Sequence, residues 1–391
     1  MTLPNLPLSR RGFLRLAGAG GAAGALAWAG HAQDPAGPPP ASDTGAEFIT
    51  KDTETAIKRG LDYLAAAQFD DGSYTERATG SSVGITALCG LALMSSGSQP
   101  GRGPYAKNVS KVLDYMLAAA GGPVPGFLTV ADSQNPGRGL VVQQQQAMYS
   151  HGFGCLFLSE VCGMLPDRSR QAKVREVLEL AAGLSVGAQN REGGWRYDPK
   201  PPALADVSVT VAQMMAVRAA RNAGVTIRRE VFEAGARYIL DCQLADGGFS
   251  YFRGQGFSVF ARSAAAVAGL YSVGSFRGSK DLDELNKQVE RATDRGLKYL
   301  QQFTPGRQQL NTQQIPPHHY YYGQYYAALA MWMAGGNYWA GWFPAIRDEL
   351  LGRARGPGVA WTDNAHGAAY ATAMSLIVLQ LPNNYLPILQ K

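Results

Sequence analysis

The sequence predicts an all-α protein in which six helical hairpin repeats close into a ring. Three observations support this: a motif recurs along the chain, a small-residue-rich helical stretch follows each copy, and the composition is that of a globular protein. The chain has 391 residues, 46% of them hydrophobic and 17% charged. These values exclude fibrous and disordered classes. We therefore expect one large buried core.

The N-terminal segment has the layout of an export signal. Arg10 and Arg11 precede a glycine- and alanine-rich apolar run that ends in an alanine-rich exit. The run is too short for a membrane-spanning helix, and no later segment stays apolar long enough to be one. We interpret residues 1–32 as a twin-arginine signal peptide, so the protein is expected to be exported to the periplasm or the extracellular space, with no transmembrane segment in the mature chain.

A linker separates this signal from the folded part. Residues 33–47, QDPAGPPPASDTGAE, are rich in proline, glycine and alanine and have no apolar period. Such segments are extended and mobile. A single repeat domain is expected over residues 48–391.

Charge and cysteine content exclude several functions. The formal net charge of +6 falls to about +3 without the three arginines of the signal. That charge is too weak and scattered for a nucleic-acid-binding surface. The four cysteines lack CxxC spacing, so we expect buried thiols rather than a zinc ribbon or a disulfide framework. The sequence indicates no nucleic-acid partner, no cofactor and no metal.

The recurring motif defines the first helix of each repeat. RGLDYLAAAQFDDGSY (59–74) and AGARYILDCQLADGGF (234–249) share the order Gly, aromatic, aliphatic, Gln, Gly, aromatic, with equal gaps. A third copy contributes Gln189, Gly193 and Trp195 at the same offsets. Degraded copies without the Gln occur within 112–127, 295–303 and 350–361. The acidic pair inside the first copy, Asp70 and Asp71, is interpreted as turn chemistry rather than a catalytic dyad.

The second helix of each repeat is rich in small residues. These stretches lie at about 82–95, 151–163, 206–223, 258–274, 322–335 and 366–381. A repeat of this size cannot bury its apolar face alone, so neighbouring repeats must stack. Small side chains suit a crowded inner circle, and the charged first helices suit the outside. The alternative is an open solenoid, which would need a polar capping repeat that the sequence does not show.

The motif resembles the QW repeat of squalene and oxidosqualene cyclases, and the related repeats of protein prenyltransferase β subunits. The resemblance covers about residues 48–381. It implies an α/α toroid of six inner and six outer helices. The motif also has a physical reason, since a Gln at the end of an outer helix can bond the free backbone groups of the next helix while the aromatic residue stacks over it.

The chain departs from the catalytic members of these families. Squalene cyclases protonate an alkene with a DxDD segment, which is absent here. The zinc site of the prenyltransferase β subunits is broken, because its Asp and Cys positions fall on Tyr320 and Tyr322, although its last His has a counterpart in His366. A substitute site built from four histidines stays open: His151, His318, His319 and His366. The Cys-Gly-Glu-Gln thioester of complement domains, which share the toroid, is also missing.

Ligands are expected at the mouth where the N-termini of the inner helices converge, because unpaired N–H groups gather there. Aligning the inner helices predicts a binding mouth of eight residues: His151, Asp206, Ser258, Arg262, Tyr322, Tyr326, His366 and Tyr370.

Several of these residues have two readings. Asp206 is either a helix cap or an acid, and His151 and His366 are either structural or functional. Arg262 needs an anion or a carboxylate, which Asp206 of the neighbouring repeat could provide. The tyrosines either line a lumen or wedge between helices.

Three functions are compatible with this sequence, and its catalytic residues are unknown. The first is an exported, atypical toroid of the family that binds a ligand or partner at its mouth, without the cyclase acid or the transferase zinc. The second is a terpenoid cyclase or isomerase that uses aromatic side chains to stabilise a cation. The third is a polysaccharide lyase with Arg262 as anion clamp and Tyr326 or Tyr370 as base. The ligand would be an isoprenoid or a glycan.

Overall fold

The computed structural model describes residues 46–76, 80–129, 147–274, 276, 278–306, 319–354 and 361–389. All of them belong to one compact unit, Ser42–Lys391. The predicted signal peptide lies outside the described residues, as does nearly all of the linker. None of the described helices is long and apolar enough to cross a membrane.

Helices make up nearly all of the regular secondary structure in the described chain, which confirms the all-α prediction. The outer helices are α2 (Lys51–Ala67), α4 (Ala106–Ala119), α7 (Arg168–Gly187), α9 (Arg229–Asp241), α11 (Lys280–Gln301) and α13 (Gly336–Arg353). The inner helices are α3 (Val83–Met94), α6 (Ala147–Val161), α8 (Val207–Asn222), α10 (Phe260–Val273), α12 (Tyr320–Ala334) and α14 (Ala368–Gln380). Short elements complete the described part: η1 (Ala46–Phe48), β1 (Thr75–Glu76) paired with β2 (Gly80–Ser81), η3 (Leu381–Asn383) and η4 (Pro387–Leu389).

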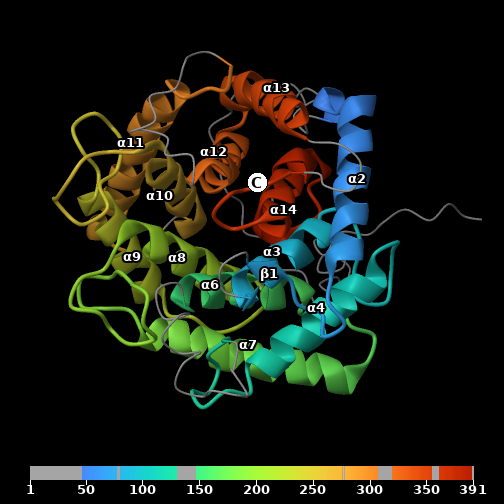
Figure 1. The fold of residues 1–391 in the computed structure, drawn as a ribbon. Coiled ribbons are helices and arrows are strands. Elements are labelled where there is room, and N and C mark those ends of the chain that lie inside the picture. Colours follow the sequence, from blue (N-terminus) through green and yellow to red (C-terminus); the bar gives the residue numbers. More distant parts are fainter. Residues whose placement is uncertain are drawn as a thin grey trace, which may run out of the picture. The chain divides into compact units, whose positions relative to one another are not determined.

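The inner helices form a closed ring within this unit. Each packs on the next in chain order from α3 to α14, and α14 packs back on α3. The outer ring closes at the same place, since α2 contacts both α13 and α14 (Figure 1). The fold is therefore an α/α toroid and not an open solenoid.

Burial follows the predicted division between inner and outer helices. Every residue of α3 is buried, as expected for a helix enclosed on all sides. Helix α2 instead buries one stripe, formed by Thr53, Ala56, Gly60, Leu61 and Leu64, and exposes most of its charged residues. The small side chains of the inner helices let six helices approach one another around the ring.

The motif glutamine joins neighbouring outer helices. The side-chain amide of Gln189 donates to the Gly193 carbonyl at 2.8 Å and to the Val231 carbonyl of α9 at 3.0 Å. Gln243 repeats this with Gly247 at 3.1 Å and Ala292 of α11 at 2.8 Å. The Val231 and Ala292 carbonyls belong to the helical backbone of the next outer helix and are not the free backbone groups of a helix end. The expected bond is therefore present, but its acceptor differs from the expected one.

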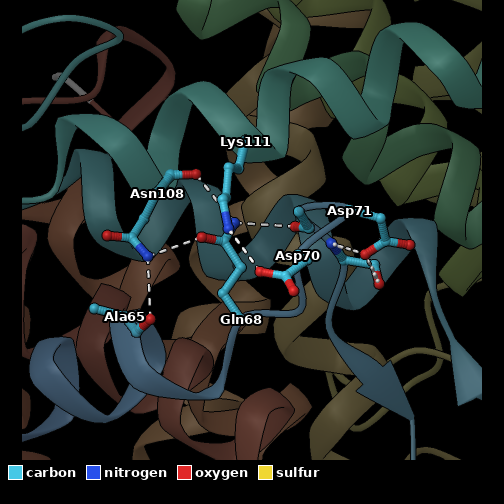
Figure 2. A network of polar contacts seen from close by, with 8 residues as sticks. Ala65, Gln68, Asp70, Asp71, Asn108 and Lys111 are labelled. Atoms are coloured by element: carbon cyan, nitrogen blue, oxygen red, sulfur yellow. Dashed lines mark hydrogen bonds and ion pairs between the residues drawn. The ribbon is translucent and has the colours of Figure 1, made fainter.

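Figure 2 shows the first copy of this arrangement. The Gln68 amide donates to the carbonyl of Asn108 on α4 at 3.1 Å, and the Asn108 amide returns a bond to Gln68 Oε1 at 2.8 Å. Asp71 Oδ1 accepts from the backbone N–H of Ser73 at 2.9 Å and from its hydroxyl at 2.7 Å. Asp70 is exposed and lies 3.4 Å from Lys111. The acidic pair therefore stabilises a turn.

The motif glycine is required by both conformation and space. Gly193 has φ +93°, a left-handed conformation that disfavours other residues. A Cβ atom there would also lie 2.2 Å from the Ala234 carbonyl oxygen of α9. The turn can therefore approach the next outer helix only at a residue without a side chain.

All four cysteines are buried free thiols, as predicted. The fold of the described unit therefore does not depend on a disulfide.

Candidate functional site

A cavity of about 760 Å³ lies at the N-terminal end of the inner ring, with lining residues from all six inner helices. Eighteen residues line it: Ser82, Gly84, Ile85, Leu88, Tyr149, Ser150, Phe153, Tyr197, Ser208, Tyr251, Val259, Ala261, Arg262, His319, Tyr322, His366, Tyr370 and Met374. Its volume falls in the range of pockets for small organic ligands.

A repeated hydrogen bond sets which inner-helix residues face the cavity. The backbone N–H of the motif aromatic residue donates to a hydroxyl on the inner helix of the same repeat, as from Tyr74 to Thr86 at 2.9 Å and from Trp195 to Thr210 at 3.0 Å. The same bond joins Phe249 to Ser263 and Trp361 to Thr372. These hydroxyls therefore point outward, away from the cavity.

The cavity-facing position lies two residues before each outward anchor. Six residues occupy it, one from each inner helix: Gly84, Tyr149, Ser208, Ala261, Tyr322 and Tyr370. On α6 the outward anchor is His151, and on α12 the corresponding position is Gln324, which is buried. Two residues along a helix are about 200° apart, which places the two sets on opposite faces.

Four of the eight predicted mouth residues line the cavity: Arg262, Tyr322, His366 and Tyr370. The other four do not, namely His151, Asp206, Ser258 and Tyr326. The predicted alignment was shifted by different amounts in different repeats, because the aligned residues lie zero to six residues before the outward anchor, whereas every inner helix begins three or four residues before it. A shift of one residue turns a side chain by about 100°.

His151 is a structural residue. It is fully buried, and its Nδ1 accepts from the backbone N–H of Leu128 at 3.3 Å. Its Nε2 therefore carries the proton and lies 3.1 Å from the Ala181 carbonyl and 3.0 Å from Ser185 Oγ, both on α7. Burial lowers the pKa of His151 to about 4. The neutral ring ties the second inner helix to the third outer helix.

This placement removes His151 from the substitute zinc site. His319 and His366 both line the cavity, whereas His318 lies outside the described residues. Within the described ranges, no group of three or more His, Cys, Asp or Glu residues is arranged to hold a metal ion.

Asp206 caps α8 with one of its two carboxylate oxygens. Its Oδ1 accepts from the Val209 N–H at 2.9 Å. Its Oδ2 is buried and has no hydrogen-bond partner among the described residues. Burial raises the pKa of Asp206 to about 6, while the Val209 bond, the Arg196 charge and the Tyr251 hydroxyl oppose this rise. The side chain is fully buried, so Asp206 lies behind the cavity wall.

The expected ion pair between Arg262 and Asp206 is absent. Arg262 Nε donates to the Phe249 carbonyl at 3.1 Å, and Nη2 donates to the Phe257 carbonyl. The guanidinium also lies 5.2 Å from the centre of the Phe257 ring. Backbone carbonyls and an aromatic face take the place of the carboxylate, and Nη1 donates to no residue in the described ranges.

Ser258 and Tyr326 support the site from outside. The Ser258 hydroxyl donates to Asp246 Oδ2 at 2.5 Å and holds the preceding turn. Tyr326 is fully buried, with its ring 4.8 Å from the rings of Tyr322 and Tyr325. Burial raises the pKa of Tyr326 well above its usual value, so the hydroxyl cannot serve as a base.

Sequence reasoning missed three tyrosines of the cavity wall: Tyr149, Tyr197 and Tyr251. The hydroxyls of Tyr197 and Tyr251 are 2.5 Å apart. The Tyr149 ring centre lies 6.5 Å from that of Tyr197 and 6.4 Å from that of Tyr322. A signal was present, because Tyr197 and Tyr251 each lie two residues after the aromatic residue of a motif copy.

The cavity wall has two chemically different sides. Arg262, His319 and His366 come from the beginnings of α10, α12 and α14. Ile85, Leu88 and Phe153 come from α3 and α6 on the other side of the ring (Figure 1). No Asp or Glu is among the described lining residues.

These features define an α/α toroid with a ligand-sized, partly aromatic cavity at one rim of its inner ring. Comparison with solved structures agrees on the fold. The chain is similar to the type II terpene cyclase MstE from Scytonema, with 14% identity and a TM-score of 0.52, over 86% of this chain and all of that one.

Two glycan-related structures share the same fold. A GH76 α-mannanase from Bacteroides thetaiotaomicron matches with 11% identity and a TM-score of 0.59, over 88% of this chain and 98% of that one. Dfg5 from Chaetomium thermophilum, solved in complex with glucosamine, matches with 14% identity and a TM-score of 0.52, over 87% and 92%. No family model and no curated protein matches the sequence. Identities this low establish the fold alone.

Proposed function

We propose that this protein binds an amphipathic ligand that carries a negative charge, in the cavity at the N-terminal ends of the inner helices. One observation carries the proposal: Arg262 and two histidines line one side of the cavity, apolar side chains line the other, and no carboxylate is among the described lining residues. We also infer that the chain is an atypical member of the QW-repeat family.

The electrostatics of the cavity favour an anion. Helix N-termini carry partial positive charge, and several open toward this space. Two nitrogens of Arg262 are bonded to the Phe249 and Phe257 carbonyls, which holds the guanidinium in place. Its third nitrogen, Nη1, donates to no described residue and is available to a ligand. A charge-assisted bond from a fixed guanidinium is among the stronger polar contacts in proteins.

The apolar side favours a hydrocarbon or ring system as the rest of the ligand. Ile85, Leu88 and Phe153 offer apolar side chains, so free energy is gained when a ligand displaces water from them. A purely polar ligand would leave this surface unused. We therefore assign the charged group to the Arg262 side and the apolar body to the α3–α6 side.

A pair of probes with the same rings tests this function. 1-Anilinonaphthalene-8-sulfonate carries an anion, whereas N-phenyl-1-naphthylamine lacks it. We expect the sulfonate to bind more tightly, and Arg262→Gln to weaken only the sulfonate, by roughly tenfold. Arg237→Gln, on an exposed residue of α9, is the matched control and should change neither affinity. Equal binding of both probes, or no effect of Arg262→Gln, would refute the proposal.

A terpenoid cyclase or isomerase is the second candidate. The tyrosine rings around the cavity favour it, because aromatic faces stabilise cations, and the terpene cyclase MstE shares the fold. Native mass spectrometry of the purified protein separates the candidates. A stoichiometric polyprenyl compound that is converted to a cyclic product on incubation would support the enzyme over simple binding.

A polysaccharide lyase has less support. It would use Arg262 as clamp and Tyr326 or Tyr370 as base, but Tyr326 lies behind the wall with a raised pKa. Glycans enter as candidate ligands through the fold of the mannanase and of Dfg5. Glucosamine binding that Tyr370→Phe abolishes would favour this candidate.

Export through the twin-arginine route remains part of the proposal. It rests on Arg10 and Arg11 and on a fold whose described cysteines are all free thiols. Replacing both arginines by lysine should leave the protein in the cytoplasmic fraction. Unchanged secretion of that variant would count against the route.

A further inference from the structure

A buried acid lies behind two tyrosine hydroxyls of the cavity wall. Asp206 uses Oδ1 to cap α8, and its Oδ2 is buried with no hydrogen-bond partner among the described residues. Tyr251 is held beside Asp206, because the backbone N–H of Val207 donates to the Tyr251 carbonyl at 3.1 Å, and the Tyr251 hydroxyl lowers the pKa of Asp206. It also lies 2.5 Å from the Tyr197 hydroxyl, and both tyrosines line the cavity.

The geometry does not fix which group donates and which accepts in the series of hydrogen bonds from Asp206 through Tyr251 to Tyr197. In the contact between Tyr197 and Tyr251, either hydroxyl can donate. An ionised carboxylate only accepts hydrogen bonds, whereas a protonated one can donate. The protonation state of Asp206 therefore decides which way the two hydroxyl protons point.

We propose that Asp206 controls the hydrogen-bonding character of the cavity through Tyr251 and Tyr197, and so makes anion binding depend on pH. When Asp206 is ionised, Tyr251 donates to it, Tyr197 donates to Tyr251, and the Tyr197 oxygen offers the cavity only lone pairs. When Asp206 takes up one proton from solvent, it donates to Tyr251, Tyr251 donates to Tyr197, and the Tyr197 O–H is free to donate to an anion. This inference rests on the proposed function.

The groups around Asp206 leave it as the group of this hydrogen-bonded series that titrates near neutral pH. The charged or titratable groups that face it are Arg196, Tyr149, Tyr238, Cys242, Tyr251 and Tyr322. Burial raises the pKa of each of these tyrosines and of Cys242, so they stay neutral. The pKa of Asp206 itself is raised to about 6.

Two histidines of the lining need separate control. His319 and His366 face the same cavity, and histidines gain charge over a similar pH interval. A variant with both changed to Gln removes this contribution and serves as the reference protein. Asp206→Asn keeps a good helix cap but removes the ionisable group.

The experiment measures the affinity of 1-anilinonaphthalene-8-sulfonate from pH 8 to pH 5. In the His319→Gln/His366→Gln reference we expect affinity to rise about tenfold as pH falls, as for a one-unit coupling between anion and proton. Adding Asp206→Asn should abolish the rise, and adding Tyr251→Phe or Tyr197→Phe should reduce it to the small direct effect of the charge. Asp198→Asn, an exposed residue of the same loop, should leave it intact.

The outcomes separate this inference from the function beneath it. A full pH response in the Asp206→Asn or Tyr251→Phe protein would overturn the inference and leave anion binding standing. Absence of sulfonate binding at every pH would overturn the proposed function and the inference together. Circular dichroism of each variant identifies any that has lost its fold, and the neutral probe N-phenyl-1-naphthylamine checks that the cavity is intact.

Discussion

At the scale of single residues, one inner-helix position separates structural from cavity side chains. His151 and Tyr149 are two residues apart, yet His151 bonds α7 while Tyr149 faces the cavity. A polar residue on an inner helix is therefore no sign of a site by itself. It becomes one only where the helix turns it toward the cavity, as at the position two residues before the outward anchor.

The pKa of His151 gives a prediction for stability against pH. Burial lowers it to about 4 in the folded protein, from 6.5 in the unfolded chain. Between these two pKa values the unfolded chain binds a proton that the folded protein does not bind. The stability that the neutral His151 contributes is therefore fully present above pH 6.5 and is lost as the pH falls toward 4. The free-energy difference between wild type and His151→Gln should shrink by up to about 3 kcal/mol between pH 7 and pH 4.

Chemical denaturation of both proteins at the two pH values measures this difference. His366→Gln, at a cavity residue, is the control, and its difference from wild type should not follow the same curve. A constant gap between wild type and His151→Gln would show that His151 is not held neutral by burial.

At the scale of elements, each motif copy connects three helices. Trp195 donates its indole N–H to the Ser185 carbonyl of α7 at 2.6 Å and its backbone N–H to Thr210 of α8, while Gln189 reaches α9. The recurrence of the motif therefore reflects a repeated junction between an outer helix, its inner partner and the next outer helix. Its residue types follow from these bonds.

Removing the glutamine of one junction should weaken the fold without changing it. Gln189→Ala loses two hydrogen bonds to carbonyls and should lower the free energy of unfolding by about 1 to 3 kcal/mol. Gln302→Ala, at an exposed residue just after the end of α11, controls for the loss of a glutamine side chain at the end of an outer helix. Equal stability of the two variants, measured by urea denaturation, would contradict a connecting role for Gln189.

At the scale of the whole ring, closure couples the two ends of the described chain. Gly60 of α2 lies against α14 and the turn before it, where a Cβ would come within 2.9 Å of both Leu376 and Trp361. Residues more than 300 positions apart therefore share one packed contact. A substitution that disrupts this contact should therefore destabilise both α2 and α14.

Two glycines in outer helices test this closure with opposite expected signs. Gly60→Ala overpacks the junction and should destabilise the protein by about 1 to 3 kcal/mol. Gly183→Ala, where a Cβ meets nothing within 4 Å, should stabilise it by about 0.5 to 1 kcal/mol. Hydrogen exchange should report faster opening of α2 and α14 together in Gly60→Ala. Faster exchange in α2 alone would argue against closure.

The sequence by itself determined the all-α class, the number of hairpins, the buried thiols and which helices line the ring, because these follow from local period, residue size and a motif with fixed gaps. Tertiary structure alone decided which face of each inner helix meets the cavity. Inner helices are buried on every side, so their composition carries no amphipathic stripe from which to read orientation. Their rotation is set by contacts such as that of Thr210 with Trp195 and that of His151 with Ser185, which join residues from different helices and leave no trace in the local pattern.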